Sequence, residues 1–140
     1  YFGKAMAKKK NRSEAYHLAR QRAFVDLKKQ IVSNFDKDLR LFIDDINVRG
    51  KDKEELVKEI TIRIQNAPVE KYSVSNDRAR FLIDRREFYI GISMSKEDAR
   101  ELVKNIVLEE IEDYRISNYN NKSLEPANVI KKINLKLKKL

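Results

Sequence analysis

A stripe of residues spaced four apart constrains the fold of this chain more than any other feature. Ala15, Ala19 and Ala23 begin the stripe, and Leu27 and Ile31 continue it. Residues at this spacing lie on one face of an α-helix, so the pattern predicts a long amphipathic helix with a narrow apolar face. Because alanine carries only a methyl group, we expect the start of this helix to lie close against a β-sheet.

The start of this helix is predicted at Ser13, which can act as an N-cap. Glu14 follows in the first turn, where a carboxylate suits the positive end of the helix dipole. Two interpretations fit residues 35–50, and Gly50 is expected to end the element in either case. Helical spacing is kept by Phe35, Leu39, Phe42 and Ile46. Strand alternation is kept by Leu39, Leu41 and Ile43.

A second helix is predicted to begin near Asp52. Asp52 and Glu55 have the spacing of a capping box, in which each residue satisfies a backbone N–H of the other. Pro68 is expected to end this helix, because the residue before a proline avoids the helical region. One face of the helix is apolar and consists of Leu56, Val57, Ile60 and Ile64.

Three segments are predicted to form β-strands. Residues 1–10 are expected to be an edge strand, because their lysines suit an exposed edge. Residues 74–83 carry β-forming residues at both ends, with a bend at Asn76–Asp77. Residues 88–94 show the clearest alternation of side chains in the chain, and residues 84–87 are the expected hairpin turn.

The C-terminal third is predicted to hold one further helix and an ambiguous tail. Ser95 and Asp98 form another capping box, and the helix that they open is expected to run to about Asp113. Its apolar face consists of Ala99, Leu102, Val103 and Ile106. Residues 117–128 are polar and rich in asparagine, which is typical of a loop. Residues 129–140 fit either a helix or a strand.

These elements predict an α+β fold, in which two or three helices pack on one face of a small antiparallel sheet. We expect residues 1–114 to be the globular domain and residues 115–140 to be a polar linker followed by a basic amphipathic segment. The sheet is expected to contribute Val74, Phe81, Ile83, Phe88, Ile90 and Ile92 to the core. The helices are expected to contribute Ala19, Ala23, Leu27, Leu102, Val103 and Ile106.

The chain contains few of the residues that catalysis requires. It has no cysteine, and its three glycines are too few and too scattered for a phosphate-binding loop. His17, the only histidine, is interpreted as a surface or boundary residue. Neighbouring carboxylates point about 100° apart on a helix, so three such pairs do not converge on one substrate atom. They are Asp44–Asp45, Glu54–Glu55 and Glu109–Glu110. We therefore predict a protein without catalytic activity, cofactor or metal.

The basic character of the chain belongs to its two ends. The formal net charge is +9, yet residues 13–125 together carry a charge of −1. Three interpretations remain open: solvated lysines, attraction to the phosphates of nucleic acid or anionic lipid, and docking of an amphipathic tail on a membrane surface or a partner's groove. The candidate partner-binding residues are Lys8, Lys9, Lys10, Arg12, Lys131, Lys132, Lys136, Lys138 and Lys139.

The order of these parts resembles the LPP-twenty-like envelope lipoproteins of bacteria, over roughly residues 1–113. YFGKA precedes the helix SEAYHLARQRAFVDLKKQI, which is similar to that family's alanine-rich helix. RREFYIGISMSKEDARELVKNIVLEEI resembles the family's closing strand and helix. The residues that occupy the helix pattern are Ala15, Ala19, Arg20, Ala23, Leu27 and Ile31.

This resemblance implies a protein of the cell envelope, in the periplasm or at the outer membrane. Family members are often tethered through a lipidated cysteine ahead of the globular domain, and a chain that begins at Tyr1 is expected to be a trimmed fragment of such a protein. The related N-terminal domain of flagellar assembly protein T implies a binding module without cofactors, which acts through contacts with an envelope protein or with itself. The alternative is a cytoplasmic nucleic-acid-binding module that uses the lysine-rich termini.

Overall fold

The chain packs as two compact units. The computed structural model describes residues 1–69, 75–117 and 124–137, and the side chains of these residues except 75–79. Unit 1 holds residues 1–31 and 68–99, and unit 2 holds residues 32–67 and 100–140. Helix α1 (Arg12–Asp45) contributes to both units. These bounds differ from the expected division after residue 114.

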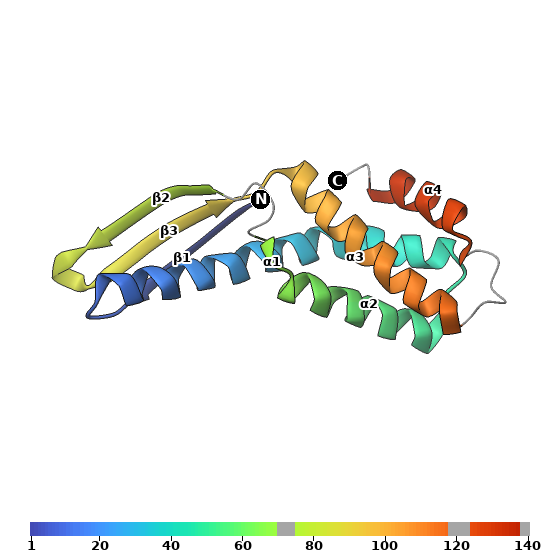
Figure 1. Cartoon of the computed structure of the whole chain (residues 1–140), viewed down its shortest axis with the longest axis horizontal. Coiled ribbons are helices and arrows are strands. Elements are labelled where there is room, and N and C mark those ends of the chain that lie inside the picture. The colour runs from blue at the N-terminus through green and yellow to red at the C-terminus, as the bar shows by residue number, and fades with distance from the viewer. Residues whose placement is uncertain (70–74, 118–123, 138–140) are drawn as a thin grey trace. The chain divides into compact units, whose positions relative to one another are not determined.

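Unit 1 is built on a three-stranded antiparallel sheet with the order β1-β3-β2 (Figure 1). Its strands are β1 (Phe2–Lys8), β2 (Ser75–Leu82) and β3 (Glu87–Ser93). The predicted α+β class is confirmed, and so is the position of β1 at an edge of the sheet. The bend expected at Asn76–Asp77 is present as an irregularity in the register between Asn76 and Arg78.

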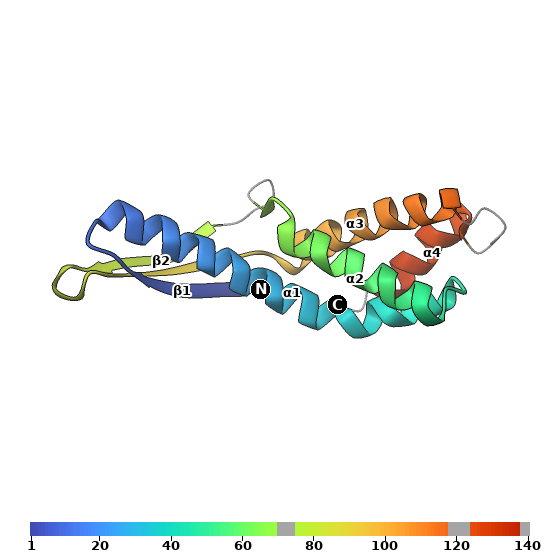
Figure 2. The same ribbon diagram turned by 90° about the horizontal axis from the view of Figure 1, so that it is seen from below.

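The first half of α1 lies along one face of this sheet (Figures 1 and 2). The predicted stripe is fully buried, with no exposed area at Ala19, Ala23 or Leu27. Gly3 of β1 lies directly against it: a Cβ atom on Gly3 would collide with the carbonyl oxygen of Ala23 and would stand 2.7 Å from the Cβ of Leu27. The strand backbone therefore touches the helix backbone, which explains why the stripe begins with small residues.

The N-cap of α1 lies two residues earlier than predicted. Asn11, and not Ser13, caps the helix: its Oδ1 accepts hydrogen bonds from the backbone N–H groups of Ser13, at 2.7 Å, and Glu14, at 3.4 Å. Both residue types are good caps. The structure uses the earlier one because α1 already begins at Arg12, which places Ser13 inside the first turn.

For residues 35–50 the helical interpretation is confirmed. Phe35 and Phe42 are each 1% exposed, whereas Leu41 is 42% exposed, so the strand interpretation is wrong. The role predicted for Gly50 is also wrong. The chain leaves α1 after Asp45 through Asn47, which has a left-handed φ of 60°, while Gly50 opens the next helix with a φ of 65°.

Helix α2 (Gly50–Asn66) therefore starts two residues before the predicted capping box. The N-cap position is occupied by Arg49, whose side chain makes no capping hydrogen bond. Asp52 instead lies in the first turn and accepts a hydrogen bond from the Tyr114 hydroxyl at 2.9 Å. The predicted apolar face is confirmed, because all four of its residues are buried: Leu56, Val57, Ile60 and Ile64.

The last two helices are α3 (Lys96–Ser117) and α4 (Pro126–Leu137). Ser95 caps α3 as predicted, since its Oγ accepts the backbone N–H of Asp98 at 3.0 Å. The tail is a helix as far as Leu137, so its interpretation as a strand is wrong there. Residues 118–123 of the expected loop lie outside the described residues. The buried face of α4 consists of Val129, Ile133 and Leu137.

Of the predicted sheet residues that the structure describes, Ile83 is exposed and Phe81 is only half-buried. Ile83 is 79% exposed, because β2 ends at Leu82 and Ile83 begins the short 3₁₀ turn η2 (Ile83–Arg85). Val74 lies outside the described residues. The helical residues predicted to face the sheet are all buried, but Leu102, Val103 and Ile106 belong to unit 2.

The contact at Gly3 predicts a contrast between two glycine substitutions. We expect Gly3→Ala to destabilise the protein by about 2 kcal/mol, because the new methyl group must displace backbone. Gly91→Ala should cost less, because its methyl group would meet only the ring of Phe2, which is 40% exposed and able to swing away. Urea unfolding followed by circular dichroism measures both changes. Equal losses would contradict this account of the Gly3 contact.

The free edge of β1 is closed by three side chains of α1. Arg22 donates from Nη1 to the carbonyl oxygen of Met6 at 3.1 Å, and Asp26 accepts the backbone N–H of Lys4 at 3.0 Å. Gln30 donates to the carbonyl oxygen of Phe2 at 2.8 Å, and it also donates to Asp26 at 3.2 Å. Because the three residues are four apart on α1, they lie on one face of the helix, beside the outward-facing backbone groups of β1. Their hydrogen bonds occupy backbone groups that could otherwise pair with another strand.

This closure predicts faster hydrogen exchange at one amide when its acceptor is removed. Asp26→Ala should accelerate exchange of the Lys4 N–H by about tenfold, the equivalent of one lost hydrogen bond. Asp26→Asn is the matched control, because it keeps a side-chain oxygen as acceptor. Exchange resolved by nuclear magnetic resonance measures both variants. An unchanged Lys4 rate in Asp26→Ala would show that the bond does not protect the edge.

Candidate interaction surface at the basic tip of unit 1

Six basic residues gather at one end of unit 1, and we call this surface the basic tip. They come from two connections, between β1 and α1 and between β2 and β3, which lie at the same end of the sheet (Figure 1). The backbone N–H of Lys9 donates to the carbonyl oxygen of Arg86 at 3.1 Å and so joins the two connections. The basic tip consists of Lys8, Lys9, Lys10, Arg12, Arg85 and Arg86.

The β2–β3 turn gives the tip a defined backbone. Residues Ile83–Arg85 form η2, and the N–H of Arg86 donates to the carbonyl oxygen of Ile83 at 3.3 Å. Arg86 itself has a left-handed φ of 54°, a backbone conformation that residues other than glycine adopt at a cost in free energy. The turn is therefore tight, and it places Arg85 and Arg86 directly beside the lysines that precede α1.

The cations of the basic tip are exposed and have no carboxylate within ion-pair distance among the described residues. Arg12 instead lies over the ring of Phe81, with its guanidinium carbon 6.0 Å from the ring centroid. The nearby acids are Glu14, Asp84 and Glu87. Glu87 accepts a hydrogen bond from the Tyr89 hydroxyl at 2.7 Å, which raises the pKa of that phenol. The tip thus presents positive charge that no described ion pair offsets.

Several cations of unit 2, in contrast, are paired. Arg63 on α2 contacts Glu109 and lies 3.1 Å from Glu110 on α3, and the hydrogen bond with Glu109 is the largest cause of its raised pKa. Lys53 lies 2.8 Å from Asp44 and lowers the pKa of that carboxyl group by donating a hydrogen bond to it. Glu54 is paired as well, at 2.9 Å from Arg40, so carboxylates from all three predicted acidic pairs form ion pairs.

The two basic ends that the sequence analysis treated together belong to different units. The four predicted residues of the N-terminal end all belong to the basic tip. Those of the other end that are described lie on α4 in unit 2, where Lys132 donates to the carbonyl oxygen of Asp45 and Lys136 lies 3.4 Å from its carboxylate. Lys131 is exposed, and two predicted residues lie outside the described residues: Lys138 and Lys139.

Sequence reasoning missed two members of the basic tip, Arg85 and Arg86. Both fall in the segment that was assigned to the hairpin turn, so the available signal was their place at the end of a hairpin. An antiparallel order with β3 in the centre brings that turn next to the connection after β1. The strand order was not deduced from the sequence, and without it the two basic segments appear unrelated.

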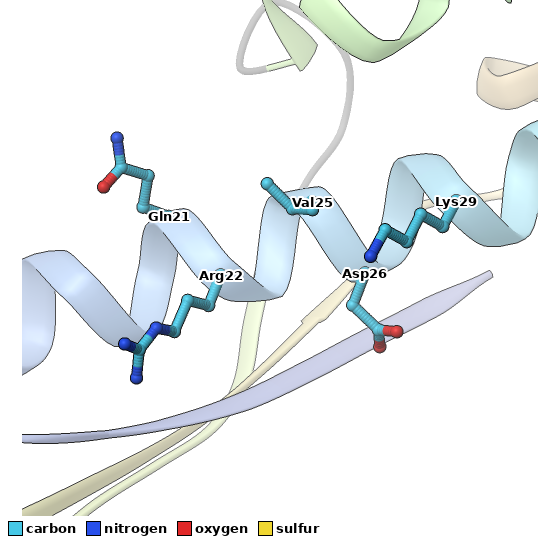
Figure 3. Close-up of a pocket in the computed structure, with 5 residues that line it drawn as sticks. All are labelled: Gln21, Arg22, Val25, Asp26 and Lys29. Atoms are coloured by element: carbon cyan, nitrogen blue, oxygen red, sulfur yellow. The ribbon is translucent and has the colours of Figure 1, made fainter.

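A pocket on α1 is a weaker candidate site. It encloses about 340 Å³ and is lined by five residues of a single helix (Figure 3). Its two central polar groups, Arg22 and Asp26, are already held by the backbone of β1. The other lining residues are Gln21, Val25 and Lys29. We interpret this pocket as the space beside the closed sheet edge.

The described residues form no metal site and no membrane-spanning helix. No group of three or more histidine, cysteine or carboxylate side chains there could hold a metal ion. His17 is exposed, and its ring centroid lies 5.3 Å from that of Tyr16. None of the helices in the described ranges has the length and apolar character needed to cross a bilayer. Comparison with family models, curated proteins and solved structures found no match.

The pairing contrast predicts that removing charge costs more stability in unit 2 than at the basic tip. Lys9→Gln/Lys10→Gln should change the free energy of unfolding by less than about 0.5 kcal/mol, because neither side chain has a described ion-pair partner to lose. Arg63→Gln should lower it by about 1 kcal/mol, because two carboxylates lose their partner. Thermal and urea unfolding measure both. Marked destabilisation of the lysine variant would show that the tip cations hold the fold together.

Proposed function

We propose that this protein is a non-catalytic binding module of the cell envelope that acts through protein contacts. The observation that carries the proposal is the face of the sheet opposite α1, which exposes apolar side chains. Phe2, Met6 and Tyr89 are each about two-fifths exposed on this face. Met6 and Tyr89 are direct partners in the register of β1 and β3, and the Phe2 ring lies over Gly91. We call these three residues the open sheet face.

The composition of this surface suits recognition of a protein. Aromatic residues and methionine are enriched in protein interfaces, where they provide large contact areas at low entropic cost. The exposed side chains of Lys4 and Lys8 alternate with Phe2 and Met6 along β1, which gives the apolar area a charged border. An exposed apolar patch that is bordered by polar residues is typical of a protein–protein interaction site. The family resemblance of residues 1–113 supports placement in the envelope.

Site-specific photo-crosslinking in living cells tests the contact surface. A photo-reactive phenylalanine analogue at Tyr89 or at Met6 of the full-length gene product should give a discrete adduct that mass spectrometry identifies as a protein. Leu135 on α4 is the matched control, because it is a 60% exposed apolar residue in unit 2. Adducts at Leu135 but at neither sheet position would disprove the assignment of the open sheet face.

Cell fractionation tests the envelope placement independently of the contact surface. The full-length gene product should appear in the periplasmic or outer-membrane fraction of its native host. Recovery of the protein with the cytoplasmic fraction would overturn this part of the proposal, whatever the crosslinking shows. Retention of crosslinks at Tyr89 in that case would leave the open sheet face as a binding surface of a cytoplasmic protein.

A further inference from the structure

An apolar side chain projects from the β2–β3 turn, within the basic tip. Ile83 is 79% exposed, more than any other large apolar residue among those described. It opens η2 and lies two residues before Arg85. Its carbonyl oxygen accepts the N–H of Arg86, and the carbonyl oxygen of Arg86 in turn accepts the N–H of Lys9. A hydrogen-bonded turn therefore holds an exposed isoleucine beside a cluster of cations that have no ion-pair partner among the described residues.

This arrangement combines two requirements for binding a bilayer surface. Cations near an anionic leaflet gain electrostatic attraction to lipid phosphates, and an apolar group gains free energy when it enters the boundary between headgroups and acyl chains. The tip provides six cations against three nearby acids, Glu14, Asp84 and Glu87. We infer that the basic tip docks on an anionic phospholipid surface, with Ile83 inserted among the headgroups and the lysines and arginines on their phosphates.

The apolar component favours lipid over nucleic acid. Proteins that bind single strands stack bases on exposed aromatic rings, and a branched aliphatic side chain has no flat face for stacking. Phe81, the aromatic ring that Arg12 lies over, is only partly exposed, and the centroid of the Phe88 ring lies 6.1 Å from its own. Contact with a sugar–phosphate backbone would bury little of the apolar surface of Ile83. The boundary between the headgroups and acyl chains of a bilayer would bury much more of it.

Vesicle co-sedimentation tests the electrostatic part with a charge-matched control. The chain should bind vesicles of equal parts phosphatidylcholine and phosphatidylglycerol, should not bind pure phosphatidylcholine, and should bind less as salt rises. Lys9→Gln/Lys10→Gln should weaken binding by about thirtyfold, because it removes two cations that lie near the anionic surface. Lys37→Gln/Lys58→Gln removes the same charge from exposed positions in unit 2 and should leave binding nearly unchanged. Equal losses in the two variants would overturn a localised tip.

Two variants of one residue test insertion. Ile83→Ser should weaken vesicle binding by about tenfold, and Leu135→Ser is its control on an exposed apolar residue of unit 2. The chain contains no tryptophan, so Ile83→Trp introduces a single indole. Its emission should shift to the blue on anionic vesicles and be quenched by brominated acyl chains, while that of Leu135→Trp should not. Vesicle binding without a shift at Ile83→Trp would overturn insertion.

Nucleic acid supplies the competing outcome. Binding of an oligonucleotide that is lost in Lys9→Gln/Lys10→Gln, unchanged in Ile83→Ser and accompanied by no vesicle binding would overturn the lipid assignment. The vesicle experiments use purified components only, so their failure does not affect the crosslinking test at Tyr89. Failure of that crosslinking test in turn leaves lipid docking by the basic tip intact.

Discussion

The close contact between the β1 backbone and α1 is the constraint on which the rest of unit 1 depends. Gly3 lies against the Ala23 carbonyl and the Leu27 side chain, so neither element has room for larger residues at this point. The close approach leaves the outward-facing polar groups of β1 within reach of Arg22, Asp26 and Gln30. One helix thereby covers one face of the sheet and closes one of its edges. Contacts of unit 1 with a partner are therefore left to its remaining surfaces, which include the open sheet face and the basic tip.

The charged residues of the chain serve two different physical roles. In unit 2, arginines and lysines join helices by pairing with carboxylates, as Arg63 does between α2 and α3. Each such exposed ion pair contributes little to the free energy of folding. Together the carboxylates of unit 2 balance most of its positive charge. In unit 1, the basic tip keeps its charge because its cations have no described ion-pair partner. Unit 1 thus presents a localised positive field at the end of its sheet where the basic tip lies.

The sequence predicted features that depend on periodicity and missed those that depend on strand order or on local competition. The four-residue spacing predicted the burial of Ala19, Ala23 and Leu27, because a helix face is a property of one element. The choice of Asn11 over Ser13 as cap depended on neighbouring residues with similar capping strength. Exposure of Ile83 was missed because strand alternation continues through Ile83, while the strand itself ends at Leu82. Four of the six residues of the basic tip followed from local charge, and the other two, Arg85 and Arg86, required the β1-β3-β2 order.

The left-handed backbone of Arg86 has a consequence for how the turn can change. Glycine or asparagine at this position would relax the conformation and make the hairpin more stable. Either replacement would also remove one cation from the surface that we assign to phosphate contacts. Fold stability and affinity for an anionic partner therefore make opposite demands on one residue. An arginine at a φ of 54° satisfies the second demand at the expense of the first.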